Sequence, residues 1–186
     1  MDIFSKFSDD IKKFNAMYGM PVADAPAFIS TKRLKDFKAI LAKELDEIDD
    51  VIELAEKIES EPSVNAVHEL RHELQVALAD LLGDLQVYCA SEMAKWGLPL
   101  DETLRIIMQS NFSKMGADGN PIYDEQGKLQ KGPDYWKPEP RLSLLLESAT
   151  LHAADVALCK QATELDKQAG SLRRRALGLG VEEKAG

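Results

Sequence analysis

Residues 67–88, VHELRHELQVALADLLGDLQVY, decide the fold. An apolar residue returns every three or four positions along this segment, which is the period of one face of an α-helix. The pattern continues toward Gly97 and Pro99, which are typical of a helix end, so the spacing predicts a helix over about 63–96. Its stripe consists of Val67, Leu70, Leu74, Ala77, Leu81, Leu85 and Tyr88.

A second long helix is predicted over about 31–59, where an apolar stripe of the same period precedes Glu61-Pro62-Ser63. Shorter helical patterns cover about 3–18, 100–113 and 141–170, whereas 115–140 is rich in glycine and proline and predicts a loop with a small hairpin. The second stripe consists of Leu34, Phe37, Leu41, Leu45, Ile48, Ile52 and Ala55.

The expected fold class is all-α. We expect an antiparallel helical bundle of four to five helices, with a Gly/Pro-rich loop after the fourth helix. A few helices with broad apolar faces are too few to cover one another, so the bundle is expected to be completed by oligomerisation, as a homodimer or homotetramer.

Composition narrows the classes of partner. The chain has 186 residues, 45% of them hydrophobic, and a net charge of −9, which disfavours nucleic acids and anionic membranes as partners. No run of 18 uninterrupted apolar residues occurs, so a cytoplasmic protein with no membrane partner is expected. The two cysteines, Cys89 and Cys159, indicate neither a disulfide framework nor a zinc site and are expected to be buried, reduced thiols.

Four acids lie beside the two long stripes. Glu44 and Glu47 are three residues apart, and Asp80 and Asp84 are four apart, so each pair shares one helix face. Carboxylate oxygens suit Mg²⁺, with Mn²⁺ as a substitute. Two such faces opposed predict a metal site made of Glu44, Glu47, Asp80 and Asp84.

A competing motif is His68-Glu69-Leu70-Arg71-His72, which fits the H-E-x-x-H pattern of zinc peptidases, with Glu92 as the third ligand. The helical stripe runs unbroken from 73 to 92, which would carry Glu92 about 30 Å from His72. A zinc metallopeptidase is therefore a remote alternative.

The paired acids, followed by residues 110–140, SNFSKMGADGNPIYDEQGKLQKGPDYWKPEP, resemble the all-α nucleoside triphosphate pyrophosphohydrolases. This MazG-like group includes phosphoribosyl-ATP pyrophosphohydrolase and the dimeric dUTPases, and the resemblance covers about 10–140. Glu44 and Glu47 match the E-x-x-E half of its motif. The E-x-x-D half differs, because Leu81 stands three residues before Asp84 and the acid has moved to Asp80.

The resemblance implies a MazG-like domain over 1–140, with a C-terminal helical extension and tail over 141–186. It also implies Mg²⁺-dependent hydrolysis of a nucleoside triphosphate to the monophosphate and pyrophosphate, in nucleotide-pool housekeeping. Glu47 is the expected proton acceptor. The residues expected to bind the substrate are Asn111, Lys114, Lys128, Lys131 and Tyr135. The alternative is a non-catalytic helical module for dimerisation or interaction.

Overall fold

The computed structural model describes residues 6–177 and is all-helical over that range, which confirms the predicted fold class. An isolated antiparallel bridge between Tyr123 and Leu129 is the hairpin-like turn expected in the loop. Positions 3–5 of the first predicted helix lie outside the described residues. The helices are α1 (Phe7–Met17), α2 (Thr31–Asp46), α3 (Ile48–Ser60), α4 (Val64–Lys95), α5 (Leu100–Phe112) and α6 (Glu139–Ala176).

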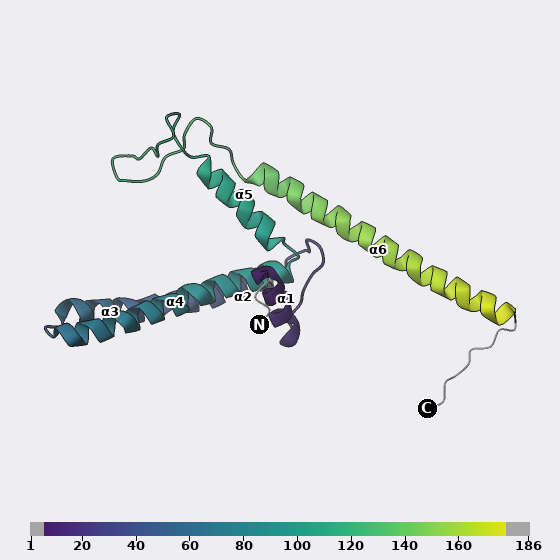
Figure 1. The fold of residues 1–186 in the computed structure, drawn as a ribbon, viewed down its shortest axis with the longest axis horizontal. Coiled ribbons are helices and arrows are strands. Elements are labelled where there is room, and N and C mark those ends of the chain that lie inside the picture. The colour runs from purple at the N-terminus through teal and green to yellow at the C-terminus, as the bar shows by residue number, and fades with distance from the viewer. Residues whose placement is uncertain (1–5, 178–186) are drawn as a thin grey trace, which may run out of the picture.

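The centre of the fold is an antiparallel helical hairpin. Figure 1 shows α2 and α3 following one another along α4, which returns beside them after the turn at 61–63. The short helix α1 packs near the C-terminal end of α4, whereas α5 leaves that end in another direction. The long helix α6 lies beside α5 only near its own beginning.

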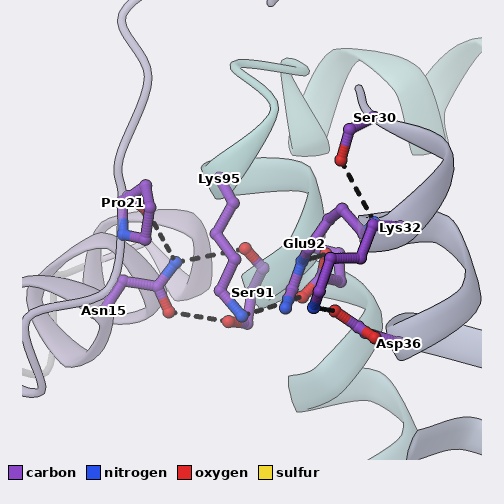
Figure 2. Close-up of polar contacts among 9 residues, drawn as sticks. Asn15, Pro21, Ser30, Lys32, Asp36, Ser91, Glu92 and Lys95 are labelled. Atoms are coloured by element: carbon purple, nitrogen blue, oxygen red, sulfur yellow. Dashed lines mark hydrogen bonds and ion pairs between the residues drawn. The ribbon is translucent and has the colours of Figure 1, made fainter. Parts of the chain in front are cut away.

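A buried hydrogen-bond cluster attaches α1 to α4 (Figure 2). Asn15 is completely buried, and its Oδ1 accepts a hydrogen bond from the Ser91 hydroxyl at 2.7 Å. Its Nδ2 donates to the Ser91 carbonyl at 3.1 Å. Apolar contacts complete the junction, where Ile11 packs on Ala90 and Ala94. Because buried polar groups require partners, this pairing fixes how α1 sits on α4.

The predicted single helix over 31–59 is divided at Glu47. The Glu47 N–H donates to the Glu44 carbonyl at 3.3 Å, a tighter i to i+3 contact, and Glu47 caps both α2 and α3. Its φ of −67° and ψ of −13° remain close to helical values, so the chain continues in nearly the same direction. The division falls on one of the acids assigned to the metal site.

The predicted buried face of α2 and α3 is partly wrong. Leu45, Ile48 and Ile52 were expected to lie in the core, but they are exposed. The face that meets α4 is the neighbouring flank, which includes the half-buried Val51 and the buried Glu44. The stripe of α4 is confirmed as its packing face: Leu70 and Leu81 are buried and its other members are half-buried.

The single chain leaves much apolar surface uncovered. It exposes 14571 Å², whereas a compact monomer of 20.6 kDa exposes about 8,900 Å². On α4, Val76, Leu78 and Leu82 are exposed on sides that no described helix covers. Oligomerisation stays a prediction, and this excess surface supports it. The expected burial of the two cysteines is wrong in the single chain, since Cys89 and Cys159 are both exposed.

Helix α6 is longer than expected. It continues through Ala176, so residues 171–176, predicted to be part of a frayed tail, are helical. Residues 178–186 of that tail lie outside the described residues. No residue of α6 is buried.

Candidate functional site

Tyr88 marks the place where three of the predicted ligands gather. Burial raises its pKa, and so do the charge of Glu44, a hydrogen bond to Glu44, and the charges of Asp84 and Glu47. A tyrosine is affected by these carboxylates only if its hydroxyl lies near them. Glu44, Glu47 and Asp84 therefore lie around the Tyr88 hydroxyl at the junction of α2, α3 and α4, and their role as metal ligands stays a prediction.

Glu44 is the most unusual of the three, because the residue is buried, with a relative exposure of 5%. Within residues 6–177, no lysine or arginine forms an ion pair with it. A buried carboxylate beside like charges costs free energy unless a cation compensates it. The electrostatics of this position thus fit a divalent cation with hard oxygen ligands.

Asp80 lies in an adjoining groove of about 480 Å³ between α3 and α4. Glu47 lines the same groove, so it connects Asp80 with the group around Tyr88. The lining is strongly acidic, with Lys57 as its one basic side chain. The remaining acids of the lining are Asp50, Glu53 and Glu73. Glu73 lies about 10 Å from Asp80 along the helix axis, and both line this groove.

The acids are neighbours without forming a closed coordination shell. Among residues 6–177, no three His, Cys, Asp or Glu side chains stand close enough together to hold one metal ion. Glu47, Asp80 and Asp84 are exposed, so their side chains are free to change rotamer, whereas Glu44 is fixed by burial and by Tyr88. Glu44 is the anchored member of the group.

The predicted substrate-binding residues lie at the other end of α5. Asn111 is exposed on the last turn of that helix, and the half-buried Lys114 follows it. Helix α5 is about 20 Å long and leads away from the hairpin, so a single chain does not bring these residues to the acids (Figure 1). The acids and the phosphate-binding candidates form two separate groups in one chain.

The loop that carries the other candidates is folded back on the end of α5. The Gly132 N–H donates to the Lys114 carbonyl at 3.0 Å, and the Ser110 hydroxyl donates to the Trp136 carbonyl at 2.8 Å. The Lys131 ammonium stands 4.6 Å above the Tyr135 ring. These contacts keep the loop and Lys114 together.

Lys128 belongs to a tight turn within that loop. Its N–H donates to Asp124 Oδ1 at 2.7 Å, and the Asp124 N–H donates back to the Lys128 carbonyl at 3.0 Å. The turn leaves Lys128 exposed. Asn111, Lys114, Lys128, Lys131 and Tyr135 are thus all placed on one ordered unit, consisting of the end of α5 and its loop.

The zinc-peptidase alternative is contradicted. His68, His72 and Glu92 all lie on the continuous helix α4, and the last two are 20 positions apart, or about 30 Å. Both histidines are exposed, whereas Glu92 is buried, forms an ion pair with Arg33, and accepts a hydrogen bond from Lys95 at 2.8 Å. The three side chains do not meet at one metal.

Sequence reasoning missed two features of this region. Tyr88 was assigned to the apolar stripe, although its position four residues after Asp84 would place both on one face. The second is a groove of about 360 Å³ at the N-terminal end of α2. Phe28 and other loop residues line it together with Arg33, Lys95 and Trp96. The indole N–H of Trp96 is buried there without a hydrogen-bond partner.

Comparisons with known proteins do not identify a family for this chain. No family model and no curated protein matches the chain. Among solved structures, it is similar to a chain named a putative NTP pyrophosphohydrolase from Exiguobacterium sp. 255-15, with 22% identity and a TM-score of 0.39. The match covers 82% of this chain and 98% of that chain. A similarity of this size does not assign the chain to a family.

Proposed function

We propose that this protein is a Mg²⁺-dependent nucleoside triphosphate pyrophosphohydrolase. The observation that carries the proposal is the uncompensated burial of Glu44, with Glu47 and Asp84 beside it around Tyr88. The resemblance of the paired acids and of residues 110–140 to the MazG-like group supports the same activity.

The chemistry requires attack of water on the α-phosphorus. The bond from that phosphorus to the oxygen that bridges it to the β-phosphorus breaks, and pyrophosphate leaves. Glu47 is the proposed acceptor of the water proton, because it is exposed and lies at the break between two helices, next to the other acids. Mg²⁺ or Mn²⁺ held by Glu44, Glu47, Asp80 and Asp84 would neutralise phosphate oxygens.

The phosphate-binding side of the site is proposed to come from a second copy of the chain. Asn111 and Lys114 are remote from the acids of their own chain, and the exposed apolar faces of α2, α3 and α4 are suited to a partner. In such an assembly, the lysines of one copy would meet the phosphates held at the acids of the other.

The activity is tested by incubating the purified protein with a panel of canonical and damaged nucleoside triphosphates and Mg²⁺, and measuring pyrophosphate release. Glu44→Gln should reduce the release to background while helicity is retained. Asp46→Asn is the matched control, because Asp46 is an exposed acid on the same helix and should keep wild-type activity.

Two results would contradict these proposals, and they differ in what they overturn. No turnover of any nucleotide, together with no Mg²⁺-dependent thermal stabilisation by nucleotides, would overturn the proposal and favour a non-catalytic helical interaction module. Full activity of Glu44→Gln would instead overturn the assignment of the site.

A further inference from the structure

Five leucines follow one another at intervals of seven residues along α6: Leu144, Leu151, Leu158, Leu165 and Leu172. Each of them leaves 63–68% of its surface exposed. Seven residues are slightly less than two full turns, so these side chains form one stripe that winds slowly around the helix. A leucine in each of five successive heptads supplies one of the two seam positions of a coiled coil.

The stripe is not the face that α6 uses within its own chain. Contacts between α5 and α6 involve the beginning of α6, where Leu142, Leu145, Leu146 and Ala149 are half-buried. At 100° per residue, these four lie about 100–200° around the helix from Leu144. The helix therefore has one side for α5 and a separate leucine stripe that no described residue covers.

A lipid bilayer is a poor occupant for this stripe. By length and composition, α6 passes as a helix able to cross a membrane. Its leucines continue at the same interval into a polar second half, where Leu165 stands between Glu164 and Asp166, with Lys160 and Lys167 nearby. A seven-residue interval maintained through charged sequence fits a helix partner, which needs only one narrow apolar seam.

The charge distribution selects the partner and its direction. Residues 139–157 contain three acids and one arginine, a net charge of −2, whereas 158–176 contain five bases and two acids, a net charge of +3. Antiparallel pairing of two identical helices sets each acidic half against a basic half. Parallel pairing would set like halves together and would place the two copies of Asp155 beside each other in the seam.

We propose that the leucine stripe of α6 is an interface with the α6 helix of a second copy of this chain, paired antiparallel about the region of Leu158. This interface is separate from the proposed catalytic group, and it assigns the C-terminal helix a role in assembly. It does not depend on the proposed enzymatic activity.

The first test is the mass of the full-length protein in solution, measured by light scattering at micromolar concentration. Leu158→Lys places a charge at the centre of the seam and should lower the molar mass twofold. Leu158→Met should retain the wild-type mass. Val156→Lys is the matched control, since Val156 is exposed on the same helix but lies off the stripe, about 120° from Leu144.

The second test measures direction by energy transfer between fluorophores on cysteines introduced at the exposed Ser143 and Ser171, in chains whose native cysteines are replaced by serine. These positions are about 42 Å apart along one helix. The antiparallel interface predicts strong transfer when chains labelled at 143 are mixed with chains labelled at 171, and weak transfer between copies labelled at 143.

Three results would overturn the proposal. The first is a Leu158→Lys variant that keeps both the wild-type mass and the wild-type transfer between positions 143 and 171, and the second is strong transfer between copies labelled at the same position. The third is flotation of the wild-type protein with phosphatidylcholine vesicles that is lost in Leu158→Lys, which would show that lipid covers the stripe.

Discussion

The Tyr88 hydroxyl faces Glu44 across the interface of α2 and α4, and the carboxylate of Glu44, the one buried acid of the proposed site, raises the pKa of Tyr88. A phenol hydroxyl at this place is a donor for Glu44 that does not neutralise its charge. Tyr88 thus orients Glu44 while leaving it able to attract a cation.

Tyr88→Phe should destabilise the fold by about 1.5 kcal/mol, because Glu44, a charged acceptor, loses the Tyr88 hydroxyl as a donor. The burial and the acids that raise the pKa of Tyr88 favour its neutral form in the folded state. This contribution is fully present below pH 10 and is lost as the pH rises through the folded pKa. The difference in unfolding free energy between wild type and Tyr88→Phe, measured by urea unfolding, should therefore shrink above pH 10.

Tyr123→Phe is the matched control, since Tyr123 is an exposed loop tyrosine and its loss should change stability little at any pH. A difference between wild type and Tyr88→Phe that grows above pH 10 would contradict the proposed arrangement.

Glu92→Gln should cost about 3 kcal/mol of unfolding free energy. Glu92 is buried and pairs with both Arg33 and Lys95, so the amide would leave two neighbouring cations uncompensated. Burial and the charge of Arg33 lower the pKa of Lys95, because both disfavour its charged form. Without Glu92, this charged form would be disfavoured further.

The exposed pair Lys32–Asp36 on the same hairpin provides the comparison (Figure 2). Asp36→Asn should cost less than about 1 kcal/mol, because solvent screens this ion pair. Equal losses in the two variants, measured by urea unfolding, would show that the buried network contributes no more than a surface pair.

The helices could be predicted because helical spacing is a local property, whereas the metal site made of the four acids stays a prediction. The seven-residue returns of leucine in α6 are equally visible in the sequence. The buried flank of α2 and α3 could not be predicted, because Leu45 and Ile52 form as good a stripe as the face that meets α4. Both faces are apolar, and only packing against particular neighbours decides which one a single chain buries. The separation of Lys114 from Glu44 likewise depends on the direction of α5, which no local pattern encodes.

Gly132→Ala should disrupt the loop that presents Lys114. A Cβ at this position would overlap the Met115 carbonyl oxygen and stand 3.0 Å from that of Lys114, and backbone atoms cannot move aside as side chains do. The expected result is a raised KM for the nucleoside triphosphate, with the helical circular dichroism unchanged. Gly83→Ala is the control, because a Cβ there meets nothing within 4 Å and should stabilise α4 by up to about 1 kcal/mol.

Asp84→Asn and Asp80→Asn should differ in their dependence on Mg²⁺. Asp84 acts on Tyr88 together with Glu44, so it belongs to the group around the buried carboxylate, whereas Asp80 is linked to that group only through the groove it shares with Glu47. Removing the charge of Asp84 should therefore raise the Mg²⁺ concentration needed for half-maximal pyrophosphate release more than removing that of Asp80. Titrating both variants and Asp46→Asn with Mg²⁺ measures this order directly. If Asp80→Asn has the larger effect, the ion is centred in the groove between α3 and α4 rather than at Glu44. Asp80, and not Asp84, is then the main ligand of that pair.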